Sequence, residues 1–134
     1  MKNKLNKIIT IVCFLMICTT MTAFAATTLL TYNGTGIGGK FSVNSFNISS
    51  NSNITINHNT TAWSGVGPAS TLTLTIRIYQ KNSLGLYSST KDYFTCTGVG
   101  SNKATFNINS GTYKLYFSSN MSAAAADING TVVK

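Results

Sequence analysis

Residue type alternates strictly between positions 71 and 79. Leu72, Leu74, Ile76 and Ile78 occupy every second position, and threonine, arginine or tyrosine stands between them. Successive side chains of a β-strand point to opposite faces of a sheet, so this period of two predicts a strand. Threonine favours a pleated, half-buried surface because its side chain is β-branched. The segment therefore predicts an antiparallel sheet with one face in the core and the other in water.

Shorter runs of the same alternation follow along the chain. They predict further strands at residues 40–48, 53–58, 93–97, 104–109, 112–118 and 128–133. Turn residues separate these runs at 34–39, 49–52, 65–68, 82–85, 98–102 and 110–111. Short strands at such spacing are typical of an all-β domain. We expect a single antiparallel β-sandwich, of jelly-roll or immunoglobulin-like type.

Two details of the pattern predict local irregularities, a β-bulge and a single helical turn. The apolar positions of residues 40–48 are odd up to Val43 and even from Phe46, which predicts a β-bulge at residues 44–45. Residues 122–127 are rich in alanine and are the helical candidate of the domain. Because so short a run is marginal as a helix, we expect a single turn within a loop.

The first 25 residues have the features of a secretory signal peptide. Three lysines at positions 2, 4 and 7 precede an apolar run at residues 8–21, and Ala23-Phe24-Ala25 supplies the small residues that signal peptidase requires. The apolar run is shorter than the roughly 20 residues that span a bilayer, and no charged segment stops it. We therefore expect cleavage after Ala25, a secreted domain at residues 26–134, and no membrane span after cleavage. The start, rich in Lys and Asn, is typical of a bacterial protein.

Cysteine usage changes at the expected cleavage site. Cys13 and Cys18 lie within the signal peptide, and Ile17 stands where a lipoprotein signal needs a small residue before Cys18. Cys96 alone remains in the mature part, so no disulfide within the chain is expected. Cys96 alternates with Phe94 on one strand face, which favours a buried thiol over a disulfide between two chains.

The charge of the expected mature part is positive. Residues 26–134 carry seven basic residues and two aspartates, a net charge of +5, and the chain has no glutamate. A cationic protein outside the cell is attracted to polyanions such as cell-wall polymers, anionic lipid headgroups or extracellular DNA. The basic residues are scattered, with no two adjacent, so they also fit a role in solubility alone. This scatter argues against specific recognition of nucleic acid.

The order of strand and turn motifs in the second half of the chain resembles that of the bacterial pre-peptidase C-terminal domain, a secreted jelly-roll module. The matching pieces are residues 74–79, Leu84-Gly85, the run Asn-Ile-Asn-Ser-Gly-Thr-Tyr-Lys-Leu-Tyr at 107–116, residues 127–133, and Phe41-Ser42-Val43 as the opening strand. Together they span roughly residues 40–133. Thr75 and Arg77 stand where such modules often carry an acidic residue. The resemblance implies a β-sandwich that serves as an accessory module of a secreted hydrolase.

Residues suited to catalysis are scarce after the signal peptide. General acid–base chemistry usually relies on His, Asp or Glu, and residues 26–134 contain His58, Asp92 and Asp127. We expect His58 at a strand end facing solvent, and no nucleophile-elbow sequence surrounds any serine. Two aspartates far apart in sequence do not make a zinc or calcium cage. The sequence therefore predicts a protein without a catalytic site, metal or cofactor.

Trp63 and four outward residues are the candidate binding residues. Trp63, the only tryptophan, lies in a predicted loop at residues 60–68. There it stacks on a sugar ring, inserts at a membrane interface, or folds over the open end of the sandwich. Tyr79 and Tyr116 fall on the polar faces of their strands, beside Arg77 and Lys114 respectively. If the two strands are neighbours, these side chains make a cationic aromatic patch suited to glycans or anionic polymers. Cross-strand tyrosine pairs also stabilise a solvated sheet without any ligand, and both interpretations stay open.

These observations favour a secreted, non-enzymatic β-sandwich that binds an extracellular surface or polymer. The partners that the charge and aromatic residues suggest are an anionic cell-wall polymer, a glycan or a membrane surface. The alternative is a small cationic effector, such as a bacteriocin or toxin, that acts on other cells. An enzyme would have to rely on His58.

Overall fold

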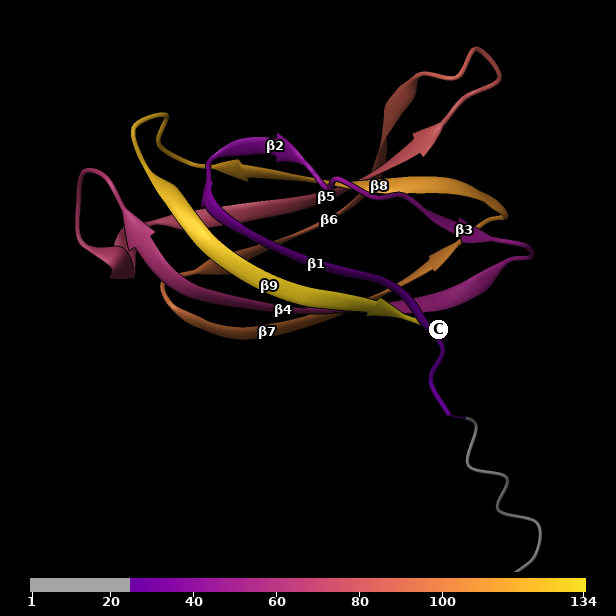
Figure 1. The fold of residues 1–134 in the computed structure, drawn as a ribbon, viewed down its shortest axis with the longest axis horizontal. Coiled ribbons are helices and arrows are strands. Elements are labelled where there is room, and N and C mark those ends of the chain that lie inside the picture. Colours follow the sequence, from indigo (N-terminus) through magenta and orange to yellow (C-terminus); the bar gives the residue numbers. More distant parts are fainter. Residues whose placement is uncertain (1–24) are drawn as a thin grey trace, which may run out of the picture.

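The computed structural model describes residues 25–134, in which the chain forms nine strands and one short 3-10 helix (Figure 1). The predicted signal peptide falls on residues 1–24, outside the described residues, apart from Ala25, and it stays a prediction. The strands are β1 (Thr28–Ile37), β2 (Gly39–Phe41), β3 (Phe46–Ile48), β4 (Ser52–Ser64), β5 (Thr73–Lys81), β6 (Tyr87–Thr97), β7 (Gly100–Ile108), β8 (Gly111–Ser119) and β9 (Ala125–Val133). The helix η1 (Ala69–Thr71) lies between β4 and β5.

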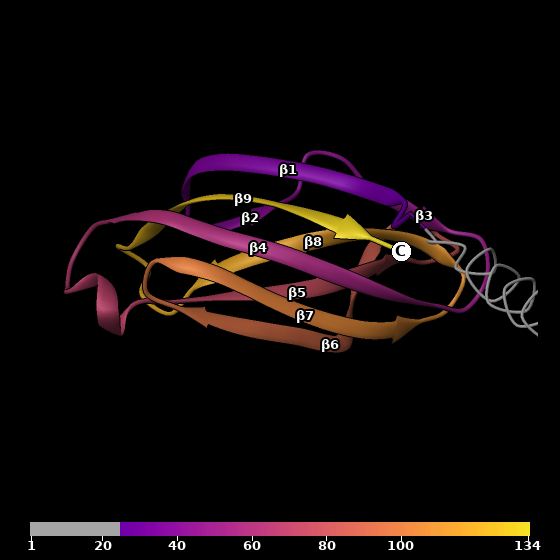
Figure 2. The ribbon, with the colours of Figure 1, turned by 90° about the horizontal axis from the view of Figure 1, so that it is seen from below.

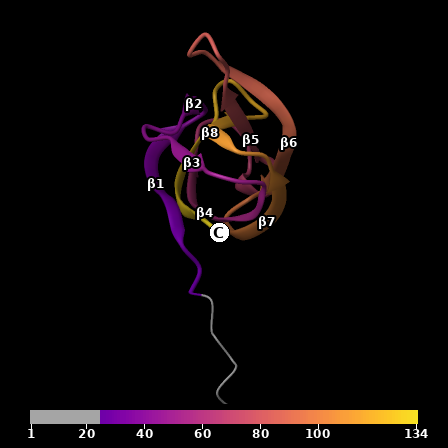
Figure 3. The ribbon, with the colours of Figure 1, turned by 90° about the vertical axis from the view of Figure 1, so that its right-hand side faces the viewer.

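The strands form two sheets that face each other across the core (Figure 3). The first sheet has the order β1-β9-β4-β7, which Figure 2 shows face-on. The second sheet has the order β2-β8-β5-β6, and β3 also pairs with β8. All neighbouring strands are antiparallel. Because β2 and β3 act as one interrupted strand, each sheet has four strands, which is the jelly-roll arrangement. The expected antiparallel sandwich is confirmed.

Alternating side chains of both sheets fill the space between them. On β5 the buried residues are Leu74, Ile76 and Ile78, as the alternation predicts, and on β4 Ile54 and Ile56 are fully buried. The remainder of the core comes from the inner faces of the other strands, and includes Leu30, Tyr32, Phe46, Ile48, Cys96, Ile108, Tyr113, Leu115, Phe117, Ala126, Ile128 and Val132. Burial of these apolar side chains is the main contribution to the stability of the fold.

Ser42 bridges the interruption between β2 and β3. Its backbone N donates to the carbonyl of Leu115 at 2.7 Å, and its Oγ accepts a hydrogen bond from Leu115 N at 3.2 Å. The Oγ also donates to the carbonyl of Asn44 at 2.8 Å. Between Phe41, opposite Tyr116, and Phe46, opposite Tyr113, four residues of this segment stand against two of β8, so the pairing is irregular there. The change of side-chain direction predicted at residues 44–45 is wrong, because the even-numbered residues Ser42, Phe46 and Ile48 are all buried. The apolar residues Phe41 and Val43 face solvent, and Ser42 is buried between them.

Three expectations for strand boundaries are wrong. The glycine-rich residues 34–39 do not form one turn, because β1 continues to Ile37 and pairs with β9. β4 runs on to Ser64, through the segment predicted as a loop. The alanine-rich segment turns only at residues 121–124, where Ala124 N donates to the carbonyl of Met121, and β9 already begins at Ala125.

Candidate functional site

The structure brings four of the five predicted binding residues together on the outer face of the second sheet. β5 and β8 are neighbours, and their register pairs Arg77 with Tyr116 and Tyr79 with Lys114. The condition for a cationic aromatic patch is therefore met. We call this surface the aromatic face; it consists of Phe41, Arg77, Tyr79, Tyr87, Lys114 and Tyr116.

The rings of the aromatic face form one cluster around Phe41. The Phe41 ring centroid lies 4.8 Å from that of Tyr116, 5.0 Å from that of Tyr79 and 6.5 Å from that of Tyr87. The Tyr79 and Tyr116 rings lie 5.6 Å apart, tilted by 58°. Phe41 takes this position because β2 pairs with β8 so that Phe41 stands opposite Tyr116. Phe41 remains 43 % exposed, so the cluster keeps an apolar surface open to solvent.

Cations flank the ring cluster. The Arg77 guanidinium lies over the Tyr93 ring, with Cζ 4.6 Å from its centroid, and Lys114 Nζ lies 5.5 Å from the centroid of Tyr87. Such cation–π contacts restrain the charged groups while leaving their N–H donors available. Asp92 precedes Tyr93 on β6, so its side chain leaves the opposite side of the strand. The face thus combines flat rings with positive charge.

Trp63 does not belong to this surface. It lies on β4 of the first sheet, where it pairs with Ala126 on β9. A register shift between Thr60 and Ala62 reverses the parity of the strand, so that Trp63 points inward and packs against the core. Its Nε1 donates to the carbonyl of Gly98 at 2.9 Å. The expectation of a flexible loop is wrong for Trp63, and the ring closes one end of the sandwich.

His58 is also not where the sequence analysis placed it. It lies in the middle of β4 with its side chain 2 % exposed, between Tyr32 and Thr60. Tyr32 OH and His58 Nδ1 are 3.0 Å apart, and His58 Nε2 lies 3.0 Å from Thr60 Oγ1. Burial lowers the pKa of His58 to about 4, because desolvation disfavours the imidazolium. The ring is thus a neutral, hydrogen-bonded part of the core.

Gly130 makes the contact between Tyr32 and His58 possible. Tyr32 is on β1 and His58 on β4, and Gly130 of β9 stands between them in the sheet register. A Cβ at Gly130 would collide with the Tyr32 ring and with the carbonyl oxygen of Asn57. Without a side chain there, Tyr32 extends across β9 and reaches the imidazole.

The other titratable residues are dispersed. Asp127 is on β9, where its Oδ1 accepts a hydrogen bond from Gly36 N at 2.9 Å, and Asp92 is on β6 of the second sheet. Cys96 is fully buried, and burial raises its pKa to about 11. Among residues 25–134, no three His, Cys, Asp or Glu side chains gather as metal ligands would. No helix in the same range is long and apolar enough to cross a bilayer.

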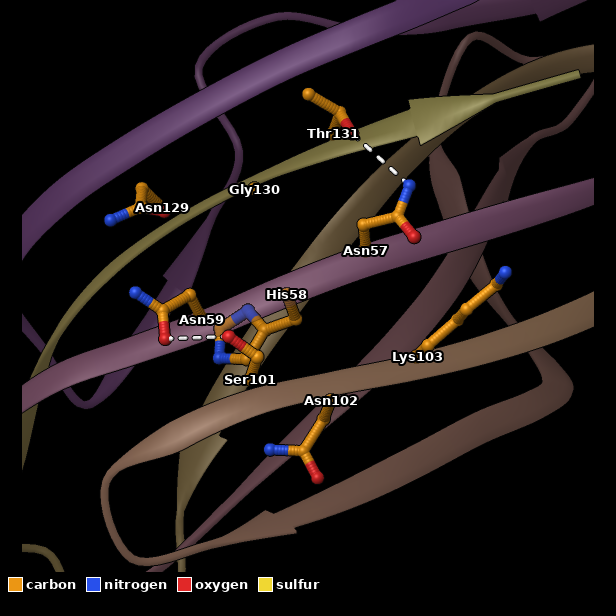
Figure 4. A pocket seen from close by; sticks show the side chains of 9 residues that line it. All are labelled: Asn57, His58, Asn59, Ser101, Asn102, Lys103, Asn129, Gly130 and Thr131. Atoms are coloured by element: carbon orange, nitrogen blue, oxygen red, sulfur yellow. Dashed lines mark hydrogen bonds between the residues drawn. The ribbon is translucent and has the colours of Figure 1, made fainter. Parts of the chain in front are cut away.

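A polar hollow lies on the outer face of the first sheet (Figure 4). It has a volume of about 430 Å³ and is lined by Asn57, His58, Asn59, Ser101, Asn102, Lys103, Asn129, Gly130 and Thr131. Two hydrogen bonds cross it: Ser101 Oγ donates to Asn59 Oδ1 at 3.2 Å, and Asn57 Nδ2 donates to Thr131 Oγ1 at 3.4 Å. The side chains of Asn57 and Asn59 thus bond to neighbouring strands, and the lining of the hollow is mostly polar.

Phe41 and Tyr87 are members of the aromatic face that the sequence analysis missed. Phe41 looks like a core residue in the sequence, but it faces solvent because it pairs with the outward Tyr116 and alternates with the buried Ser42. Tyr87 lies at the start of β6, outside the predicted strand, and pairs with Lys81. The signal for Tyr87 was the Leu-Tyr dipeptide that follows Gly85, which continues the hairpin into a second strand.

Comparisons with known proteins agree with this topology. No protein-family model and no curated protein matches the chain. Among solved structures, the pre-peptidase C-terminal domain of collagenase from Bacillus anthracis is similar, with a TM-score of 0.52 and 24 % sequence identity. The similarity covers 78 % of this chain and 89 % of that domain. Residues 25–134 thus have a β-sandwich fold like that of a pre-peptidase C-terminal domain.

Proposed function

We propose that this domain is a secreted, non-enzymatic module that binds an extracellular polymer or surface through its aromatic face. The observation that carries the proposal is the cluster of Phe41, Tyr79 and Tyr116 beside Arg77 and Lys114 on one solvated sheet. Rings held on strands lose little conformational entropy when a ligand stacks on them. The chemistry fits a polymer that presents both flat or apolar surface and negative charge, such as an anionic glycan of an envelope or matrix.

A role in binding rather than catalysis fits the positions of the titratable groups. His58 is buried between two hydrogen-bonding partners, and Asp92 and Asp127 lie in different sheets. A glycosidase of the usual kind needs two carboxyl groups that flank one bond. The similar solved domain is named as part of a collagenase, which fits an accessory role beside an enzyme.

The proposal is tested by co-sedimentation of residues 26–134 with insoluble polymers. The panel comprises bacterial cell walls, insoluble polysaccharides and fibrillar collagen, the last because the similar domain belongs to a collagenase. A double variant, Tyr79→Ala with Tyr116→Ala, removes two rings of the cluster and is expected to lower binding by about tenfold or more, since a ring that stacks on a flat ligand group contributes about 1 kcal/mol. Both side chains are on the solvated face, so the fold is expected to survive.

A matched pair of lysine variants separates specific binding from general attraction of charge. Lys114→Ala removes a cation of the aromatic face, and Lys103→Ala removes one from the outer face of the first sheet. If the aromatic face binds the polymer, Lys114→Ala weakens binding and Lys103→Ala leaves it nearly unchanged. Equal losses, together with release of the protein at moderate salt, would show that net charge alone is responsible.

A further inference from the structure

The β5–β6 hairpin projects from the sandwich as a narrow finger (Figures 1 and 3). Its tip carries Leu84 and Leu86 on either side of Gly85, and the two leucines are 82 % and 64 % exposed. Isolated exposed leucines are common, but two beside each other at the summit of a protruding turn form an apolar wedge. Neither leucine is used by the fold or by the aromatic face.

Hydrogen bonds within the turn pair four of its backbone N–H groups. Asn82 Oδ1 accepts from Leu84 N at 3.0 Å and from Leu86 N at 2.9 Å. Gly85 N donates to the carbonyl of Asn82 at 3.0 Å, and Asn82 N donates to that of Leu86 at 2.8 Å. An unsatisfied N–H is costly in an apolar medium, so the internal pairing of the Leu84, Gly85 and Leu86 N–H groups favours entry of the tip into such a medium. Gly85 permits this turn because its φ of 83° is in the left-handed region.

Positive charge and an aromatic ring lie directly behind the apolar tip. Lys81 stands opposite Tyr87 in the hairpin register, and the Lys81 stem runs alongside Gly85. Lys114 Nζ lies over the Tyr87 ring, 5.5 Å from its centroid. In an anionic bilayer, leucine side chains favour the hydrocarbon, whereas tyrosine and lysine favour the headgroup region. The leucines at the tip and the tyrosine and lysines near it match this arrangement.

We propose that the tip of the β5–β6 hairpin, residues 82–86, inserts into the surface of anionic lipid membranes. A lipid surface fits this feature better than a protein partner, because two side chains on a convex turn are far smaller than the roughly 1,200 Å² of a stable protein interface. A wedge of this size suffices for shallow insertion when headgroups attract the cations behind it. The membrane contact shares Tyr87 and Lys114 with the aromatic face, but it depends on Leu84 and Leu86 and does not require that face to bind a polymer.

Vesicle binding with the wild-type domain and two aspartate variants tests the inference. Vesicles of phosphatidylglycerol mixed with phosphatidylcholine are expected to bind the wild type, and the double variant Leu84→Asp with Leu86→Asp is expected to bind at least about tenfold less. Val99→Asp is the matched control, because Val99 is also exposed and apolar but lies in the β6–β7 turn at the opposite end of β6. Equal loss in both variants, or no binding by the wild type, would overturn the inference.

A fluorescent label locates the inserted segment. Leu84→Cys can be labelled selectively with an environment-sensitive dye, because the native Cys96 is fully buried. Insertion predicts a blue shift of the label on adding the vesicles and quenching by lipids that carry a quencher in their acyl chains. The same label at Val99→Cys is expected to show neither. A vesicle-bound protein whose label at position 84 stays in water would place the contact elsewhere and refute the inference.

Discussion

Lowering the pH from 7 to 5 is expected to reduce the free energy of unfolding through the side chain of His58. Its pKa is about 4 in the folded protein, against 6.5 for an ordinary histidine. Between these two values the unfolded chain binds more protons than the folded one, so acid favours unfolding. The contribution of neutral His58 to the free energy of unfolding is fully present above pH 6.5 and is lost as the pH falls toward 4.

The expected size of the effect follows from the shift. Each pKa unit corresponds to about 1.4 kcal/mol, and pH 5 lies 1.5 units below the pKa of the unfolded histidine, which gives a loss of about 2 kcal/mol. That is a substantial part of the 5–15 kcal/mol typical of a domain. With a urea m-value of about 1–2 kcal/mol per molar, the midpoint of unfolding should move down by about 1–2 M.

Urea unfolding at the two pH values, followed by the fluorescence of Trp63, measures this loss. His58 is the only histidine of the chain, so a matched variant isolates its contribution. In His58→Gln the side-chain amide can still accept from Tyr32 OH and donate to Thr60 Oγ1, but it does not titrate. We expect this variant to be less stable at pH 7 and nearly independent of pH down to 5. An equal acid loss in wild type and variant would refute the assignment to His58.

Three further predictions concern packing and backbone pairing. Gly130→Ala should destabilise the domain by about 2 kcal/mol or more in denaturant unfolding, because its methyl group would displace Tyr32; Gly39→Ala, whose Cβ meets only ordinary contact, should be nearly neutral. Ser42→Ala should cost about 1–3 kcal/mol, since it leaves Leu115 N buried without its acceptor, and an unchanged thermal midpoint would contradict this. Cys96 should stay unreactive toward a thiol reagent at pH 8 until the protein unfolds, because its thiol is fully buried with a raised pKa; rapid labelling of native protein would disprove it.

The alternation of apolar and polar residues predicted most of the strands, because one face of each strand packs in the core and the other faces solvent. Residues 71–79 illustrate this: Leu74, Ile76 and Ile78 are buried, as their spacing requires. β1 was missed for a physical reason. It contains Gly34 and Gly36, which favour a turn, and it is held as a strand by pairing with β9 and by the packing of Tyr32 over Gly130. That contact involves residues almost a hundred positions apart.

The candidate site was predictable only in part for the same reason. The polar-face positions of Tyr79 and Tyr116 follow from local parity, but their proximity depends on β5 and β8 being neighbours. Trp63 was misplaced because a bulge reverses the direction of every side chain that follows it, and Phe41 because the polar Ser42 faces the core while its apolar neighbours face solvent. At Phe41 the irregularity is stabilised by Ser42 bonding to β8, and at Trp63 by the register shift against β9. Neither partner strand is evident from the bulged segment itself.

The neighbouring ends of the domain determine how it responds to mechanical tension. Thr27 and Lys134 exchange backbone hydrogen bonds of 2.8 and 2.9 Å, so the chain enters and leaves the fold at one point. β1 and β9 run antiparallel from that point. A force applied between the two ends would break the bonds of this pair one after another, as a zipper opens, instead of loading them together in shear. β1 would therefore peel away at low force, whereas a pull between Lys134 and a surface held by the aromatic face on β5 and β8 would load the packed core of the sandwich.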